Sequence, residues 1–393
     1  MKKVCLIFTL IICCLCFASC ANAPLDSSKK PDGNNTDTPI FDNVMPSPEF
    51  EYPTEPRKFV VKYIRDMAMT PWTPQETFQM YGKYQAWSYN LTYTKDVKYF
   101  GPPFLTDSRG TMQEFQYNIK DGVYVGGITG SSCIGSACYD AVYVTLIQVC
   151  PSISFESTED MLPGNETGLL PVGDWDTTIS KHDTKNILNQ YTISEMAQNY
   201  AQLEPGDVVL KHLVSQDAGH TRIVSGGPVI YYNNDNTINF KKSYITTIEQ
   251  TNAWDKTVTH NTTWFVDRSY TFEALYNGFF VPVTPEDYTK DVSNADIVAT
   301  NVITENEIAN ANKLKGEIKS NHYITQIKVS ITNDDDNVIY ERSIFPNTKY
   351  YNLYDFSFHP ALYNYENGTY NLKIEASLAF GTKTIADYDF VLE

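Results

Sequence analysis

The sequence predicts a mixed α+β domain that is followed by an all-β sandwich. Three observations support this prediction. Apolar residues recur at helical spacing in the first half of the chain, short strand signals follow Gly206, and residues beyond 294 carry only alternating runs separated by turns. Helices that precede a set of antiparallel strands are typical of α+β domains.

The helices and strands of the first part can be placed individually. The spacing of apolar residues from Phe59 to Met67 predicts an amphipathic helix that ends near Pro71, and Thr73-Pro74 predicts a short helix through Tyr81. Further helices are expected in residues 137–149, 193–203 and 272–278. Strands are expected in residues 207–210, 221–225, 229–232, 244–251 and 263–266.

The last hundred residues have the pattern of a sandwich. Asp334–Asn337 and Glu366–Thr369 are turn signals between alternating apolar runs. This spacing predicts an immunoglobulin-like β-sandwich over residues 294–393. Its strands are expected in residues 314–318, 324–331, 338–342, 370–378 and 386–392.

The first 20 residues have the pattern of an export signal. Lys2 and Lys3 precede an apolar run that is too short for a good membrane span, and the run closes on Phe17-Ala18-Ser19-Cys20. This segment resembles the lipobox of bacterial lipoproteins, although Phe17 stands where an aliphatic residue is usual. The resemblance implies lipidation of Cys20 after cleavage of residues 1–20. The alternative is an ordinary signal peptide.

The segment after Cys20 predicts a flexible linker over residues 21–56, because it is rich in Pro, Asn, Asp, Ser and Thr. With the lipobox, it predicts an exported protein held on the bacterial envelope, facing outward or into the periplasm. The membrane is then expected as a partner through the lipid anchor only.

Composition narrows the set of partners. The formal net charge is −17, which argues against binding to nucleic acid or to anionic membranes. Of 8 cysteines, only Cys133, Cys138 and Cys150 lie beyond Cys20. An odd number is a poor disulfide framework for an exported protein, so a free thiol is expected.

Cys138 is the first candidate for chemistry. Ser136 predicts a helix N-cap, which places Cys138 at the second helical position, where unpaired backbone N–H groups and the helix dipole favour a thiolate. A thiolate is a nucleophile. The alternative is a buried and inert cysteine, since free cysteines are usually buried.

Two further segments bear on whether Cys138 is part of a catalytic site. Leu203-Glu204-Pro205-Gly206-Asp207-Val208-Val209 predicts a turn that enters a strand, and Gly219-His220 begins the next strand. Together with Cys138 at a helix start, these segments resemble NlpC-type cell-wall peptidases and the related CHAP amidases. The resemblance implies a papain-like domain over residues 57–286, with Cys138 as nucleophile and His220 as base.

The segment from Ile245 to Thr251 resembles the CHAP strand that orients the histidine. The resemblance implies Glu249 as the third catalytic residue, while Thr251 replaces the Asn of that family. On a strand, Glu249 and Thr251 share one face and Gln250 faces the other side. The alternative for Glu249 is a solvated strand carboxylate.

Other residues leave the assignment open. Tyr139 and Asp140 replace the Ser-Gly that usually follows the NlpC cysteine, and either could crowd the sulfur or raise its pKa. Cys133 is the rival nucleophile. His182, His212 and His260 lack Cys or Asp partners at ligand spacing, so neither a metal nor a cofactor is expected.

The expected function is hydrolysis of an amide bond in a cell-wall peptide or in peptidoglycan by Cys138, His220 and Glu249. Two alternatives remain. The chain could be a non-catalytic surface-binding lipoprotein that keeps the fold, or a transglutaminase-like domain, which also orders Cys, His and an acid.

Overall fold

The computed structural model describes residues 50–393, except 81–90, 107, 130–131, 165, 179–182, 217, 310 and 312. The predicted signal peptide, Cys20, His182 and residues 21–49 of the predicted linker lie outside the described residues. The described residues belong to one compact unit.

The described end of the predicted linker is packed rather than free. The Glu51 N–H donates to Phe380 O at 3.1 Å, and the rings of Phe50 and Tyr52 lie edge-on to the Phe380 ring. Two aromatic side chains bury enough apolar surface to order this short segment. Phe50, Glu51 and Tyr52 are therefore not part of a flexible linker, although the sequence predicted one there.

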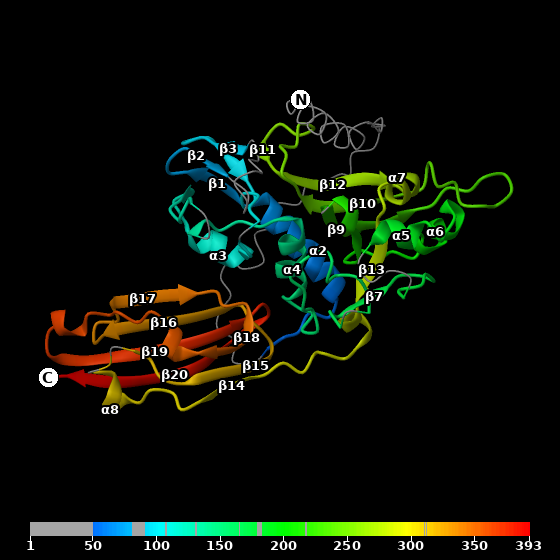
Figure 1. Cartoon of the computed structure of the whole chain (residues 1–393). Helices are drawn as coiled ribbons and strands as arrows, with labels where there is room; N and C mark the ends of the chain where they lie inside the picture. The colour runs from blue at the N-terminus through cyan, green and yellow to red at the C-terminus, as the bar shows by residue number, and fades with distance from the viewer. Residues whose placement is uncertain are drawn as a thin grey trace, which may run out of the picture. The chain divides into compact units, whose positions relative to one another are not determined.

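The mixed α+β class is confirmed, and more residues lie in strands than in helices (Figure 1). A six-stranded sheet has the order β12-β10-β9-β8-β13-β7, and every ladder in it is antiparallel. Its strands are β7 (Leu169–Pro171), β8 (Val208–Leu213), β9 (Ala218–Val229), β10 (Tyr244–Gln250), β12 (Trp264–Thr271) and β13 (Val281–Pro285).

Four predicted helices are confirmed, namely α2 (Pro56–Met69), α4 (Cys138–Leu146), α6 (Ile193–Tyr200) and α7 (Phe272–Asn277). The helices α2 and α4 pack on each other and on β9 and β10, while α6 packs on α7. Further helices are α3 (Met112–Tyr117), α5 (Thr184–Leu188) and α8 (Glu305–Ile308).

The helix expected from Thr73 to Tyr81 is wrong. Its described residues form β1 (Pro71–Pro74) and β2 (Phe78–Met80). Trp72 lies in β1 with only 1% of its surface exposed and contacts a cluster of aromatic rings. Alternate burial of this segment stabilises strands and outweighs the helix-start signal of Thr73-Pro74.

The strand β1 belongs to a small mixed sheet that the sequence did not reveal, with the order β11-β4-β1-β6-β5. Its other strands are β4 (Tyr99–Phe100), β5 (Ile119–Lys120), β6 (Val123–Tyr124) and β11 (Asn261–Thr262). A separate hairpin pairs β2 with β3 (Leu91–Tyr93). Strands this short carry little periodicity, so pattern reading could not find them.

The Pro205-Gly206-Asp207 turn fixes the start of β8 against β9. Gly206 has φ +93° and donates its N–H to Val224 O at 2.8 Å, while buried Asp207 accepts from Arg57 Nη1 at 2.6 Å. Asp207 O accepts the Val224 N–H at 2.8 Å. The turn therefore helps to set the register of the strand that carries His220.

Gly206→Ala is expected to destabilise the protein by about 1–3 kcal/mol, because its positive φ disfavours a residue with a Cβ. An added Cβ would also lie 3.0 Å from the Tyr288 hydroxyl and 3.2 Å from Arg57 Cα. Urea unfolding measures this loss. The control is Gly122→Ala, also at positive φ (+79°) but with no atom within 4 Å of the added Cβ. If Gly206→Ala is no more destabilising than this control, the close packing of the turn contributes nothing.

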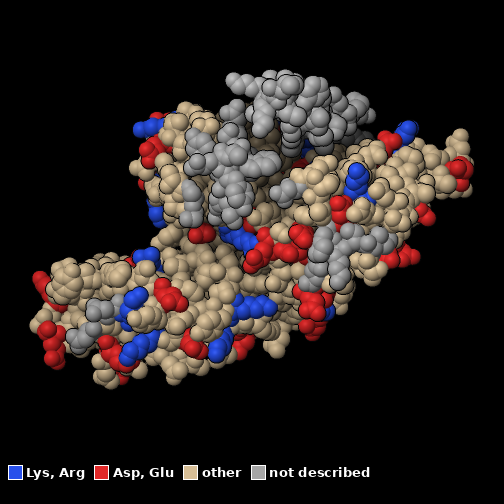
Figure 2. All heavy atoms as spheres, in the orientation of Figure 1, with Lys and Arg blue, Asp and Glu red and all other residues tan. Residues whose placement is uncertain are grey.

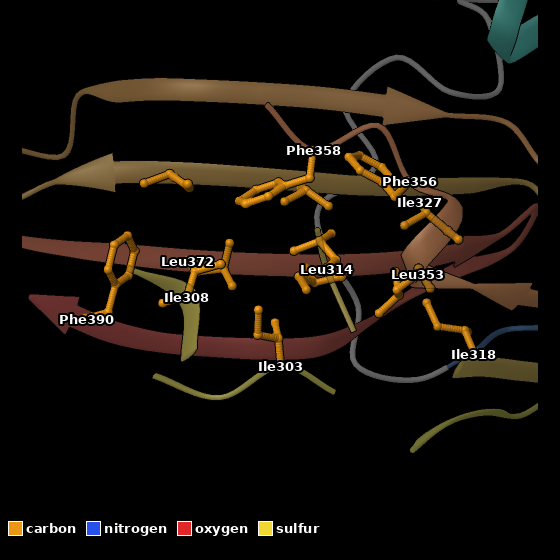
Figure 3. Close-up of a cluster of buried hydrophobic side chains, with 14 of the residues drawn as sticks. Ile303, Ile308, Leu314, Ile318, Ile327, Leu353, Phe356, Phe358, Leu372 and Phe390 are labelled. Carbon is orange, nitrogen blue, oxygen red and sulfur yellow. The ribbon is translucent and has the colours of Figure 1, made fainter. Parts of the chain in front are cut away.

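The C-terminal residues form a two-sheet β-sandwich. One sheet has the order β14-β15-β18 and the other β17-β16-β19-β20. The shared core includes Leu353, Phe356 and Phe358, whose side chains lie between the sheets with Ile327 and Leu372 (Figure 3). The strands are β14 (Ile297–Thr300), β15 (Glu317–Ile324), β16 (Gln326–Asn333), β17 (Val338–Ile344), β18 (Thr348–Asn352), β19 (Gly368–Leu378) and β20 (Gly381–Leu392).

The surface and the helix lengths give two further facts. On the face drawn in Figure 2, Lys and Arg side chains are interspersed with Asp and Glu, with no continuous basic area among the described residues. Within the described ranges, every helix is too short or too polar to cross a bilayer.

Candidate functional site

Cys138 is the first residue of α4, one position earlier than predicted. Ala137 is the N-cap, with extended backbone (φ −90°, ψ 179°). Ser136, the predicted cap, instead donates its hydroxyl to Gln250 on β10. Gln250 also donates to Pro102 O at 2.8 Å. These buried contacts fix the start of α4 against β10, so the sulfur is held at the sheet.

The two residues after Cys138 are both engaged elsewhere. Tyr139 packs against the aromatic cluster around Trp72. Buried Asp140 accepts from Arg109 Nε at 3.0 Å through Oδ1 and from the Ala137 N–H at 3.3 Å through Oδ2. Ala137 has no polar side chain with which to cap the helix, and the Asp140 carboxylate instead binds a backbone N–H at the start of α4. The charge of Asp140 is paired with that of Arg109.

The Cys138 thiol is buried, with 9% of the residue exposed. Burial raises its pKa to about 12, although the backbone amides of Thr221 and Tyr139 donate toward the sulfur and favour the thiolate. Asp140 and Glu249 both disfavour the thiolate. At neutral pH the sulfur therefore carries its proton and needs a base to become a nucleophile.

His220 and Glu249 lie on neighbouring strands and contact each other as the sequence resemblance implied. His220 Nε2 donates to Glu249 Oε2, with His220 on β9 and Glu249 on β10. Burial lowers the pKa of His220, and the Glu249 carboxylate partly offsets this effect. His220 is therefore a neutral imidazole at pH 7, the form that can accept a proton.

Glu249 is held by three side chains. It accepts from His220, from Arg222 Nε at 2.6 Å and from the Tyr270 hydroxyl, and it is 2% exposed. Burial alone would raise its pKa, but Arg222, His220 and Tyr270 together hold the pKa well below its ordinary value. Glu249 is thus a buried, ionised carboxylate and not a solvated one.

Sequence reasoning missed Arg222 and Tyr270. Arg222 lies two residues beyond His220, so both side chains lie on one face of β9. The two-residue spacing in a predicted strand could have indicated from the sequence that Arg222 lies beside His220. Tyr270 lies on β12, and its contact with Glu249 depends on the pairing of β10 with β12, which the sequence does not specify.

The sulfur of Cys138 reaches the sheet where β10 leaves β9. Pairing between these strands ends at Ile248 and Ile223, whereas β10 continues to pair with β12 as far as Gln250. The Thr221 amide is thereby left to face Cys138. The helix α4, which begins at Cys138, packs on both β9 and β10.

Within the described structure, no hydrogen bond joins Cys138 to His220, although direct reach was expected. His220 and Thr221 point to opposite faces of β9 because strand side chains alternate. Glu249 occupies His220 Nε2, and Nδ1 makes no hydrogen bond with any described residue.

Thr251 does not supply a fourth site residue. The strand β10 ends at Gln250, and the Thr251 hydroxyl donates to Ala253 O at 3.1 Å within a local turn. The expectation that Thr251 shares a strand face with Glu249 is therefore wrong, because the strand ends too early. Gln250 does face away from Glu249, toward Ser136.

The rival residues have other surroundings. Cys133 is fully buried in the aromatic cluster, where burial raises its pKa to about 12, and Cys150 is also fully buried. All three described cysteines are free thiols. His212 Nδ1 is bonded to Thr158 Oγ1 at 3.0 Å, and His260 packs on Phe100. In the described part of the chain, no three His, Cys, Asp or Glu residues form a metal-binding group.

Comparisons with known proteins identify no family for this chain. The sequence matches no model of a known family and no curated protein. A solved structure of PorZ, a surface component of the type-IX secretion system of Porphyromonas gingivalis, matches with 10% identity and a TM-score of 0.15. The match covers 44% of this chain and 23% of PorZ, so it spans less than a quarter of that protein.

Proposed function

We propose that the chain is a cysteine hydrolase in which Cys138 is the nucleophile, His220 the base and Glu249 the residue that orients His220. One observation carries this proposal. Cys138 is the first residue of α4, and α4 packs on β9 and β10, the two strands that carry the hydrogen-bonded pair His220 and Glu249. This arrangement leaves His220 Nδ1 as the acceptor for the thiol proton.

The mechanism follows from the protonation states. His220 Nδ1 removes the proton from Cys138 as the sulfur attacks an amide carbonyl, and the imidazolium then protonates the leaving amine. The Cys138 backbone N–H, at the first turn of α4, is placed to stabilise the oxyanion. Water then attacks the thioester while His220 accepts its proton, the C–S bond breaks to release the carboxylic acid, and His220 returns the proton to the Cys138 sulfur.

The finer fold assignment and the substrate rest on the sequence resemblance. Residues 57–286 are a papain-like domain of the NlpC or CHAP type, and residues 294–393 are an immunoglobulin-like accessory module. The substrate is an amide bond of a cell-wall peptide or of peptidoglycan. The lipid anchor on Cys20 holds the enzyme on the bacterial envelope.

The burial and raised pKa of Cys138 favour a second candidate. A thiol that is 9% exposed and has no hydrogen bond to His220 also fits a non-catalytic surface-binding lipoprotein that retains the fold. The two candidates differ in whether His220 takes the proton from the sulfur. Reactivity of Cys138 as a function of pH separates them.

Labelling of Cys138 by iodoacetamide is expected to reach a plateau above the pKa of His220, because neutral His220 then accepts the thiol proton. An isolated thiol with a pKa of about 12 would instead react about tenfold faster for each pH unit between pH 7 and 9. Mass spectrometry of Cys138 measures the rate. Cys133 and Cys150 are internal controls, since both are fully buried.

His220→Ala is expected to convert the plateau into the tenfold rise per pH unit. A tenfold rise in the unaltered protein, unchanged by His220→Ala, would eliminate the hydrolase and leave the binding protein. Labelling of Cys133 faster than Cys138 would contradict the choice of nucleophile.

A further inference from the structure

Two aromatic rings contact the guanidinium group of Arg222. The centroid of the Tyr270 ring, on β12, lies 3.9 Å from Arg222 Cζ. The centroid of the Phe280 ring, which directly precedes β13, lies 4.1 Å from the same atom. The residue is only 6% exposed. A buried arginine that contacts two aromatic rings loses little further freedom when it forms a hydrogen bond, so its direction is fixed in advance.

This fixed guanidinium is directed at the carboxylate that holds His220. Arg222 Nε and His220 Nε2 both donate to Glu249 Oε2, while the Tyr270 hydroxyl donates to Oε1. Glu249 Oε2 therefore accepts hydrogen bonds from both the candidate base His220 and the permanently charged Arg222. Phe280 also contacts His220 edge-on, with ring centroids 6.2 Å apart.

We propose that Arg222 is a positioning residue that compensates the charge of Glu249 and thereby keeps His220 as a neutral base. Glu249 alone would draw a proton onto His220 and stabilise imidazolium. The buried guanidinium balances that carboxylate, so Glu249 orients the imidazole without charging it. The consequence for catalysis rests on the proposed function, whereas the effect on His220 does not.

The other charged groups near His220 do not replace Arg222. Lys211 on β8 also opposes protonation of His220, but its Nζ lies over the Phe280 ring at 5.3 Å. Cys138 carries no charge at neutral pH. Burial is the largest cause of the lowered pKa of His220, and Arg222 and Lys211 add to it against Glu249.

Arg222→Gln is expected to move the titration of His220 to higher pH, because Glu249 then acts on the imidazole without compensation. NMR of the full chain with ¹³C-labelled histidine measures the titration, and His220→Gln assigns the signal. Arg222→Met removes the charge without adding a polar group, and the same upward shift is expected. In the labelling assay, both variants are expected to move the pH at which the plateau begins upward.

Arg268→Gln is the matched control. Arg268 also lies over the Tyr270 ring, with Cζ 5.8 Å from its centroid, but among the described contacts it donates nothing to Glu249. This variant removes one positive charge from the same strand group and is expected to leave the His220 titration in place.

The outcomes distinguish this proposal from the hydrolase. An unchanged His220 titration in folded Arg222→Gln and Arg222→Met, checked by circular dichroism, overturns the role of Arg222, even if Cys138 labelling shows the plateau. A shifted titration without any plateau supports the role of Arg222 and removes the hydrolase. A shift of equal size in Arg268→Gln would mean that only general charge acts.

Discussion

Cys138→Ala is expected to lower the rate of amide hydrolysis by about 10³-fold or more, because loss of the nucleophile removes the covalent route. The substrate is purified peptidoglycan, and released peptide or new amino groups measure the reaction. His220→Ala is expected to lose a similar amount, and the double variant no more than either single one. Residues that act as one unit are not additive.

Cys133→Ala is the matched control for this prediction. Cys133 is also a buried free thiol, but it lies in the aromatic cluster beside Tyr124. Its replacement is expected to leave the hydrolysis rate within about twofold, since it removes no group from the site. Hydrolysis that persists in Cys138→Ala would assign the reaction to another residue.

Glu249→Leu is expected to destabilise the fold by about 3–5 kcal/mol, because it leaves the buried Arg222 guanidinium without its carboxylate. The cost arises from an unpaired buried charge and not only from the lost hydrogen bonds. Urea unfolding followed by circular dichroism measures the change in the free energy of unfolding.

Two controls isolate this cause. The double variant Glu249→Leu with Arg222→Met is expected to be more stable than Glu249→Leu alone, since both charges are then absent. Asp267→Asn breaks the exposed Arg65–Asp267 pair and is expected to cost less than about 1 kcal/mol. A double variant no more stable than Glu249→Leu would show that the buried charge is not the cause.

The candidate site was predictable in parts that depend on local pattern. A cysteine at the start of an apolar helix, a histidine after the Pro-Gly-Asp turn and a carboxylate on the next strand are all short-range signals. The contact between His220 and Glu249 followed because adjacent antiparallel strands place their residues side by side. Arg222 lies on the same strand as His220, and its spacing could have placed it in the predicted site.

Other parts of the site depended on long-range contacts. The ring contacts of Arg222 come from Tyr270 on β12 and from Phe280, which directly precedes β13. The true N-cap of α4 depends on Ser136 turning to Gln250, 114 residues later. Such side chains choose between partners by tertiary packing, which local propensity does not describe.

The sequence by itself determined the α+β class, the main helices, the strands around His220 and the alternating strands of the C-terminal sandwich. These features depend on the period of apolar residues, which each segment carries alone. Only the tertiary structure decided that residues 71–74 and 78–80 form strands, that Phe50 and Tyr52 are packed, and that Arg222 pairs with Glu249. Each of these depends on burial against residues distant in the chain, and burial sets both the strand choice and the charge balance.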